Sequence, residues 1–461
     1  MDSASPLLRF QEVRRFTTSL TDGLAPEDQV VQSMEDVSPT KWHLAHTSWF
    51  WEVFVLEPHL AGYQALDPDY HFLFNSYYVQ AGERHCRAQR GWLSRPTVAQ
   101  VMDYRSHVDE GMEALLSDAA RLAGDPELQA LVELGMNHEQ QHQELMLTDL
   151  KHVFGVNPLR PAYRAGSEAG AEAGSEADVQ DDAQAPGASP DAMAPPLRFV
   201  EFPGGVHEIG QAGAGNPAAN GAPFAYDNEG PRHRRFLEPF ALADRLVTNG
   251  EYLEFMADGG YRRPELWMSA GWAAREAHGW TEPFYWEERE GSWRSFTLSG
   301  LRQLRMNEPV VHLNWYEADA YARWAGARLP REDEWEVAAR ADLEASAPLG
   351  GNLAESGRFH PAAAAGSAPD LASGHEGNDP ATIRQLLGDA WEWTASDYAP
   401  YPGYRPAPGA VGEYNGKFMT GQYVLRGGSC ATSRSHLRIT YRNFFPPEAA
   451  WQFTGLRLAR D

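Results

Sequence analysis

A tract without hydrophobic periodicity divides this chain of 461 residues into two parts. Residues 164–196 consist mainly of alanine, glycine, glutamate, aspartate and proline, a composition that cannot offset the entropy of ordering by burying apolar surface. We therefore expect a first domain over 1–160, an acidic low-complexity linker over 161–196 and a second domain over 197–461. A milder stretch of the same character, 345–379, predicts a long surface loop inside the second domain.

Charge and cysteine content exclude several classes of protein. The chain has 39 basic and 64 acidic residues and a formal net charge of −25, which opposes binding to nucleic acid or to an anionic membrane. Its two cysteines, Cys86 and Cys430, are far apart in sequence, which is typical of a reducing compartment and leaves no Cys-rich metal site. The N-terminus has no apolar run of signal-peptide length. The sequence therefore predicts a soluble cytoplasmic protein without nucleic-acid or membrane partners.

The first domain has a helical pattern. Ser38 followed by Pro39 predicts the cap and first turn of a helix. The segments with apolar residues at helical spacing are Leu7 to Leu20, Ser38 to Leu56, Val98 to Leu122 and Pro126 to Phe154. A longer connection separates the second segment from the third. The economical architecture for this all-α domain is a four-helix bundle.

The second domain has shorter elements and many turns. Two apolar runs, Phe199 to Phe202 and Val206 to Ile209, flank Pro203-Gly204-Gly205 and predict a β-hairpin. Helices are expected after Thr248, which forms a capping-box pattern with Glu251, from Asn314 to Ala325, and from Glu332 to Arg340. This half is therefore expected to be α+β with much irregular structure.

The strongest chemical signal is a pair of histidines. His138 and His142 are four residues apart, so they are neighbours on one helix face and can bind the same metal ion. The alternative is a pair of core histidines satisfied by hydrogen bonds. A third ligand should come from another helix of the bundle, where His43 and His46 lie three residues apart and need not both point inward; we favour His46.

A site of three histidines is typical of catalysis, because neutral ligands on one side leave coordination positions open for exogenous molecules. The chemistry then depends on the metal. Zinc would ionise water or a thiol, whereas ferrous iron could bind a thiolate substrate and O₂ together.

Motifs from both parts of the chain carry a family resemblance. The runs are LAH at 44–46, HEQQHQE at 138–144, and, in the second part, WYEADAYARWAGARLPREDEWE, GDAWEWTASD, VLRGGSC and TGLRLARD. With these motifs the chain resembles the ergothioneine-pathway sulfoxide synthases. The resemblance implies an all-α DinB-like four-helix bundle followed by an α+β, loop-rich domain that is formylglycine-generating-enzyme-like (C-type-lectin-like).

The resemblance also implies a reaction. It implies a mononuclear non-haem Fe(II) enzyme that uses O₂ to join the sulfur of cysteine or γ-glutamylcysteine to the imidazole of hercynine (Nα-trimethylhistidine), with formation of a C–S bond and a sulfoxide. By motif position, the iron ligands would be His46, His138 and His142, the same three that the residue pattern favours. Gln141, on a neighbouring face of the helix, would orient the substrate imidazole beside the iron.

Two departures indicate a particular branch of that family. Val411 stands where the actinobacterial branch has a catalytic tyrosine, three residues before Tyr414, and residues 443–445 read Asn-Phe-Phe in place of Asn-Trp-Asp. Both changes resemble the branch in which proton-donating tyrosines come from the bundle loop, which favours Tyr77 and Tyr78 as catalytic residues. The lost acidic contact favours free cysteine over γ-glutamylcysteine.

The substrates are zwitterions, so the site needs a cation near their carboxylates and a π-face or carbonyl near the trimethylammonium group. Arg87 and Arg90 are the expected carboxylate clamp, with two further arginines of the same loop as competitors and a solvated loop as the alternative. Phe444 is expected to contact the quaternary ammonium, with Asn443 beside it and Tyr414 nearby.

Three other hypotheses stay open. A zinc-dependent thiol S-transferase would use the same histidines without O₂, a binding module would hold a structural metal, and an ovothiol-type sulfoxide synthase would act on histidine itself. Cys430 lacks a cysteine partner in its own domain, so we expect no formylglycine-generating activity and a small buried side chain. Relatives of the second domain carry a structural Ca²⁺, for which the sequence indicates no particular residues, and it indicates no oligomeric state.

Overall fold

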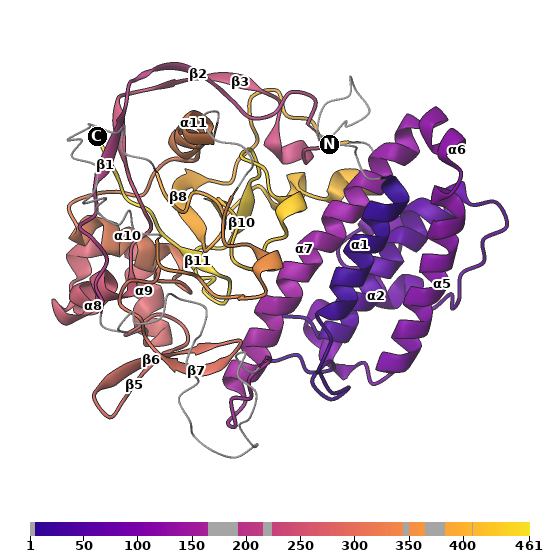
Figure 1. The fold of residues 1–461 in the computed structure, drawn as a ribbon, viewed down its shortest axis with the longest axis horizontal. Helices are drawn as coiled ribbons and strands as arrows, with labels where there is room; N and C mark the ends of the chain where they lie inside the picture. Colours follow the sequence, from indigo (N-terminus) through magenta and orange to yellow (C-terminus); the bar gives the residue numbers. More distant parts are fainter. Residues whose placement is uncertain (1–4, 165–191, 215–223, 344–349, 365–382, 408) are drawn as a thin grey trace, which may run out of the picture. The chain divides into compact units, whose positions relative to one another are not determined.

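The computed structural model describes residues 5–164, 192–214, 224–343, 350–364, 383–407 and 409–461. The chain forms two compact units (Figure 1). Unit 1 comprises residues 1–163, 210–232 and 400–419, and unit 2 comprises 164–209, 233–399 and 420–461. Two short segments from the expected second domain therefore belong with the N-terminal helices. Most of the expected linker, and residues 345–349 and 365–379 of the expected loop, lie outside the described residues.

Unit 1 is a helical bundle. Its long helices are α1 (Pro6–Ser19), α2 (Thr40–Phe50), α5 (Val98–Leu116) and α7 (Pro126–Val156), which pack against one another (Figure 1). Shorter elements are η1 (Trp51–Leu56), α3 (Glu57–His59), α4 (Tyr70–Phe74), η2 (Val79–Ala81), η3 (Arg87–Trp92), α6 (Ala119–Gly124), η4 (Asp227–Glu229), η8 (Ala410–Glu413) and η9 (Gly416–Phe418). The expected all-α domain is confirmed, with η1 a π-helical continuation of α2.

Two helix boundaries differ from those expected. Pro39 is the N-cap of α2 and no side chain caps that end, so Ser38 is not the cap. The single helix expected over 98–122 is wrong, because α5 ends at Leu116 and α6 begins at Ala119. Between them, the carboxylate of Asp118 accepts from the backbone N–H of Arg121 and starts a new helix.

Unit 2 combines small sheets with four helices of eight or more residues in its described part. One sheet has the strand order β1 (Phe199–Phe202), β4 (Phe240–Ala243), β12 (Ala459–Arg460), and a second has the order β10 (Asn443–Phe445), β9 (Tyr423–Arg426), β8 (Trp391–Asp397), β11 (Thr454–Gly455). A third sheet pairs β2 (Gly205–Ile209) with β3 (His233–Leu237). A fourth has the order β5 (Trp286–Arg289), β6 (Ser292–Thr297), β7 (Gly300–Gln303). The helices are α8 (Asn249–Ala257), α9 (Ser269–His278), α10 (Trp315–Trp324) and α11 (Glu332–Leu343), with 3₁₀ turns η5 (Gly260–Arg262), η6 (Pro264–Leu266), η7 (Ala354–Ser356) and η10 (Arg434–His436). The expected α+β class is confirmed.

The β-hairpin expected around residues 203–205 is wrong. β1 pairs with β4 and β2 pairs with β3, so the two strands enter different sheets. The backbone at Gly204 leaves no room for a side chain, because a Cβ there would lie 2.8 Å from the carbonyl oxygen of Leu237. Gly204 therefore lets the chain pass close to the backbone of Leu237 where it leaves one sheet and enters another. The segment is not the turn of a β-hairpin. The capping box at Thr248 and the helix cap at Asn314 are confirmed.

Unit 2 has its own apolar core, which packs helix α11 against the sheets. Trp335 of α11 is fully buried among leucines from β3, β4 and the later loops, such as Leu237, Leu242 and Leu387. Burial of each such side chain stabilises the fold by about 1.5–3 kcal/mol. None of the described helices in either unit is long and apolar enough to cross a membrane.

Candidate metal centre

Three histidines from α2 and α7 come together inside the bundle. His46 lies on α2, and His138 and His142 lie one turn apart on α7. One ring nitrogen from each lies within 4.8 Å of the others, and the three side chains are buried. Within the described ranges, this is the group of His, Cys, Asp or Glu side chains close enough together to share a metal ion.

Three buried ring nitrogens of this cluster have no hydrogen-bond partner among the described residues. Nδ1 of His46 donates to the carbonyl oxygen of Phe74 at 2.6 Å, whereas its Nε2 is buried and has no hydrogen-bond partner among the described residues. Both ring nitrogens of His138 are also buried and have no hydrogen-bond partner among the described residues. Because a buried polar atom without a partner is costly, a metal ion fits these residues well.

The histidines of the cluster are neutral at physiological pH. Burial lowers the pKa of His138 to about 3, and it lowers the pKa of His46 and of His142 well below the ordinary value, with further lowering from the neighbouring histidines of the site. Neutral imidazoles present lone pairs, which is the form that binds metal.

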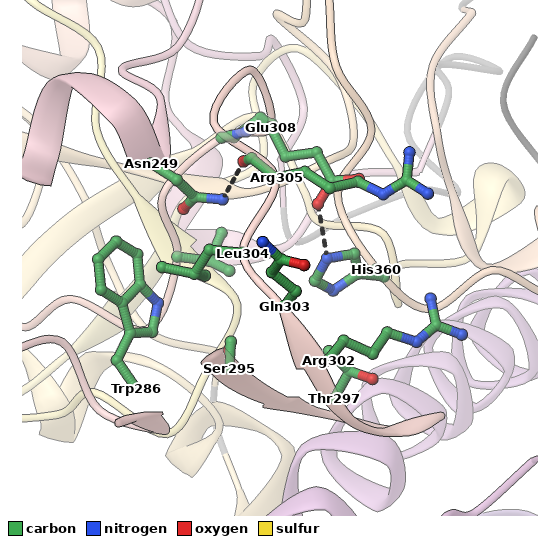
Figure 2. A pocket seen from close by; sticks show the side chains of 12 residues that line it. Asn249, Trp286, Ser295, Thr297, Arg302, Gln303, Leu304, Arg305, Glu308 and His360 are labelled. Atoms are coloured by element: carbon green, nitrogen blue, oxygen red, sulfur yellow. Dashed lines mark hydrogen bonds and ion pairs between the residues drawn. The ribbon is translucent and has the colours of Figure 1, made fainter. Parts of the chain in front are cut away.

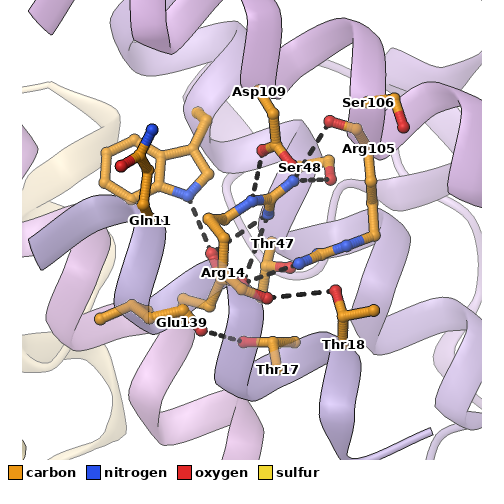
Figure 3. A network of polar contacts seen from close by, with 12 residues as sticks. Gln11, Arg14, Thr17, Thr18, Thr47, Ser48, Arg105, Ser106, Asp109 and Glu139 are labelled. Atoms are coloured by element: carbon orange, nitrogen blue, oxygen red, sulfur yellow. Dashed lines mark hydrogen bonds and ion pairs between the residues drawn. The ribbon is translucent and has the colours of Figure 1, made fainter. Parts of the chain in front are cut away.

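A buried ionic network fixes helix α7 next to His138 (Figure 3). The carboxylate of Glu139, fully buried, accepts from Arg14 of α1 and Arg105 of α5, each at 3.1 Å, and from the indole N–H of Trp51 at 3.0 Å. Burial opposes ionisation, but the two guanidinium groups outweigh it and lower the pKa of Glu139 to about 2. The network ties α1, α5 and η1 to the helix that carries two of the three histidines.

Gln141 and Tyr414 lie together beside the cluster. The phenol of Tyr414 donates to Oε1 of Gln141, and its ring centroid lies 5.8 Å from that of His138. Tyr226, from the other inserted segment, stacks on Tyr414 with centroids 5.2 Å apart. The structure thus places these two predicted substrate-binding residues at the histidines, although Tyr414 is distant in sequence.

Tyr77 and Tyr78 form a stacked pair near the same histidines. Their ring centroids are 4.5 Å apart and their hydroxyl oxygens 3.4 Å apart. Tyr78 packs on Trp49, which stacks on His46, and Tyr77 contacts the edge of Tyr414. Burial raises the pKa of both phenols above the ordinary value, so both keep their protons at neutral pH.

Glu413 and Lys417 hold the loop that carries this tyrosine pair. The carboxylate of Glu413 accepts from the backbone N–H groups of Val79 and Gln80 at 3.0 and 2.9 Å. Lys417 donates to Glu413 at 2.7 Å and to the carbonyl oxygen of Tyr77. Desolvation opposes ionisation of Glu413, but these donors outweigh it and lower its pKa to about 2.

The two predicted clamp arginines have different surroundings. Arg90 is buried, lies 3.4 Å from the ring centroid of Trp42, and donates to the hydroxyls of Ser38 and Ser76 at 2.8 and 3.0 Å. Its Nε has no hydrogen-bond partner in the part of the chain that is described. Burial lowers the pKa of Arg90 well below the ordinary value. Arg87 is exposed and donates to the carbonyl oxygen of Asp36.

The remaining predicted residues lie in unit 2. Asn443 and Phe444 are on β10, where Phe444 stacks on Tyr398 with ring centroids 4.0 Å apart. Their predicted contact with a quaternary ammonium stays a prediction. Cys430 is buried, as expected.

Unit 2 also contains a small cavity (Figure 2). Its walls come from α8, β5–β7 and the loops near them, and Glu308 accepts from Nε2 of His360 across it at 3.1 Å. No residue predicted from the sequence lines this cavity. Its residues do not provide the three metal-binding side chains that the described histidine cluster does.

Several residues of the site were not predicted from the sequence. Asp149, which bonds His43, lies seven residues after His142, two helical turns along the same face, and this spacing could have revealed it. Tyr226 and Glu413 have no comparable local signal, because they come from segments that only the tertiary fold brings to the bundle.

Two family models match the chain. The model of the DinB superfamily matches residues 9–146, and the model of the sulfatase-modifying factor enzyme 1-like domain matches residues 185–461. These matches confirm the expected fold class, a DinB-like helical domain followed by a formylglycine-generating-enzyme-like domain.

Curated relatives match large parts of the chain. Hercynine oxygenase of Mycobacterium tuberculosis is 32% identical over 447 residues, which cover 92% of this chain and 91% of that protein. Hercynine oxygenase of Mycolicibacterium thermoresistibile is 32% identical over 459 residues, with 92% and 88% covered. Formylglycine-generating enzyme of Thermomonospora curvata is 29% identical over 296 residues, which cover 57% of this chain and 93% of that protein.

Proposed function

Because this chain belongs to the hercynine oxygenase family, we propose that it is an Fe(II)-dependent sulfoxide synthase of ergothioneine biosynthesis. It would use O₂ to join the sulfur of cysteine or γ-glutamylcysteine to the imidazole of hercynine. The observation that carries the proposal is the buried cluster of His46, His138 and His142, in which Nε2 of His46 and both ring nitrogens of His138 lack hydrogen-bond partners among the described residues.

The donor set suits ferrous iron. Three neutral imidazoles would hold the ion from one side, and the iron would supply redox chemistry with open positions for a thiolate and O₂. A set of three histidines without cysteine or carboxylate also binds zinc, so the choice of metal rests on the family and on the experiment below.

Gln141 and Tyr414 would position hercynine. The bond from the Tyr414 phenol to Oε1 of Gln141 fixes which end of the amide is the acceptor. The amide Nε2–H₂ then points elsewhere and can donate to a nitrogen of the substrate imidazole beside His138. Holding that ring in one orientation would select the carbon that receives the sulfur.

Tyr77 and Tyr78 would supply the proton. Both phenols are protonated at neutral pH because burial raises their pKa, and their hydroxyl oxygens are 3.4 Å apart. A proton lost from one Oη can therefore be replaced from the other. The stacking of Tyr78 on Trp49, and of Trp49 on His46, keeps the pair next to the histidines.

Arg90 would bind a substrate carboxylate. It is a buried guanidinium that donates to two serine hydroxyls, and an anion would compensate its burial. Arg87 remains the second member of the predicted clamp, with a more exposed position.

The test is a set of anaerobic reconstitutions with Fe(II) or Zn(II), followed by hercynine with cysteine or with γ-glutamylcysteine, with and without O₂. The proposal predicts a hercynyl sulfoxide, identified by mass, in the iron samples with O₂ and a thiol. Equal thiol transfer by the zinc enzyme without O₂ would contradict it and favour an S-transferase. Conversion of histidine in preference to hercynine would favour an ovothiol-type enzyme.

A further inference from the structure

A chain of hydrogen bonds leads away from the histidine cluster between α2 and α7. Oδ2 of Asp149 accepts from the backbone N–H of Ser38 at 2.8 Å and lies 3.0 Å from Nε2 of His43. The other ring nitrogen of His43, Nδ1, lies 2.8 Å from Nδ1 of His142. The residues Asp149, His43 and His142 are 4%, 2% and 8% exposed, so water does not compete strongly for these bonds.

The carboxylate sets the direction of every bond in this chain. An ionised carboxylate only accepts, so His43 donates from Nε2. A neutral His43 then carries a lone pair on Nδ1, and the 2.8 Å contact requires His142 to donate from its own Nδ1. The proton of His142 is thereby placed on Nδ1, and the lone pair on Nε2.

We infer that Asp149 and His43 act as positioning residues that hold His142 in the tautomer and ring orientation in which Nε2 binds the metal. The inference rests on the proposed metal site. It deepens that proposal, since it explains why one α2 histidine is a ligand and the other, three residues earlier, is not. His43 does not belong to the group of described side chains that can share an ion.

The ring of His46 is oriented in the same way, but its partner is a different group. Its Nδ1 donates to the carbonyl oxygen of Phe74 at 2.6 Å, which leaves the lone pair on Nε2. His138 differs, because its ring is held by packing on Phe50, with ring centroids 4.5 Å apart, and neither nitrogen has a hydrogen-bond partner in the described chain. Two of the three ligands are therefore oriented by hydrogen bonds at Nδ1.

Matched substitutions of His43 separate this role from a general structural one. In His43→Gln, the amide can donate to Asp149 and accept from His142, so both bonds survive with the same polarity. In His43→Leu, both bonds are lost, while the leucine side chain still fills the space of the imidazole ring. A control is His152→Leu, since His152 is a buried histidine of α7 whose Nδ1 bonds Ser33 at 2.6 Å, outside the cluster.

The measurement is a titration of each apo protein with Co(II), followed by its visible absorption bands, together with the thermal unfolding of the apo proteins. We expect His43→Leu to weaken Co(II) binding about 10–100-fold, the range found when a partner of a ligating histidine is removed. His43→Gln should retain most of the affinity and the wild-type spectrum, and His152→Leu should bind as the wild type does. Equal losses in His43→Gln and His43→Leu, or no loss in either, would overturn the inference.

Asp149 provides a second pair if His43→Leu fails to fold. Asp149→Asn keeps an oxygen that accepts from Ser38 and His43, whereas Asp149→Ala does not, so we expect the larger loss of Co(II) affinity in Asp149→Ala. Because the two residues act in series, His43→Leu with Asp149→Ala should bind Co(II) about as weakly as His43→Leu alone. Additive losses of Co(II) affinity in the double variant would contradict the inference that Asp149 acts through His43.

The tautomer itself can be observed without any variant. In apo protein with ¹⁵N-labelled histidine, the ¹⁵N shifts of His142 should be those of an Nδ1–H imidazole, and an Nε2–H imidazole would overturn the inference. Neither measurement uses hercynine, so absence of sulfoxide formation would refute the proposed function and leave this result intact.

Discussion

Glu139→Gln is the substitution for which the structure gives the clearest magnitude. The buried carboxylate of Glu139 compensates two buried guanidinium groups, those of Arg14 and Arg105 (Figure 3). Glutamine keeps the shape and one acceptor oxygen, but it places an amide N–H₂ against a cation and removes the negative charge. Arg105 would lose its carboxylate partner and Arg14 would keep only Asp109, so uncompensated charge in the bundle core should destabilise unit 1 and leave unit 2 unchanged.

The size of the loss follows from the pKa of Glu139. A lowering from the ordinary value of 4.5 to about 2 corresponds to about 3 kcal/mol of native-state stabilisation. This agrees with the roughly 3–5 kcal/mol lost when one member of a buried ion pair is removed. Since the pKa is lower in the folded than in the unfolded state, the stabilisation is complete above pH 4.5 and is lost as the pH falls toward 2.

Hydrogen exchange followed by mass spectrometry of peptides tests this prediction in each unit separately. At neutral pH, peptides of α1, α5 and α7 should exchange about 150-fold faster in Glu139→Gln than in the wild type, and those of β8 and β9 should not change. The difference should shrink below pH 4.5. The matched control is Glu133→Gln on the same helix, because Glu133 pairs with the partly exposed Arg9 at 2.7 Å and such pairs contribute about 1 kcal/mol or less. Equal effects of the two substitutions would refute the reasoning.

Three further predictions concern the proposed reaction. Replacing Tyr77 or Tyr78 with phenylalanine should shift the product from hercynyl sulfoxide toward the sulfinic acid of the thiol, measured by mass, and an unchanged product ratio in both variants would exclude the loop tyrosines as proton donors. Glu413→Gln should loosen the tyrosine loop, so peptides of 75–83 should exchange faster and the product should shift in the same direction; faster exchange without a product shift would exclude a positioning role for Glu413. Arg90→Lys should raise the KM of the carboxylate-bearing substrate about tenfold with little change in kcat, because lysine cannot form a bidentate contact, and a fall in kcat alone would contradict carboxylate binding.

Local patterns in the sequence were sufficient to predict the bundle and the core of the site. The spacing of His138 and His142 follows directly from helix geometry, and α7 carries them as expected. The choice between His43 and His46 was harder, since residues three apart on a helix point in similar directions. Both point inward in the structure, and only their partners, Asp149 for one and Phe74 for the other, distinguish them.

Other features depend on contacts between distant segments and have no local signal. Residues 203–205 have the composition of a hairpin turn, but β1 and β2 find their partners in β4 and β3. Tertiary pairing therefore overrides the turn pattern. Similarly, Tyr226 and Glu413 join unit 1 only because residues 210–232 and 400–419 fold onto the helices. The break between α5 and α6 depends on the cap at Asp118, which the apolar periodicity of residues 98–122 does not reveal.

The central claim is that His46, His138 and His142 hold one iron, and that this iron uses O₂ to join hercynine to a thiol. Its most direct measurement is O₂ consumption by protein loaded anaerobically with Fe(II), with iron content determined in the same sample. The account predicts one iron per chain, O₂ uptake only when hercynine and a thiol are both present, and loss of iron and of uptake together in His138→Ala. Full O₂ uptake in His138→Ala, or hercynine consumption by the wild type without O₂, would contradict it.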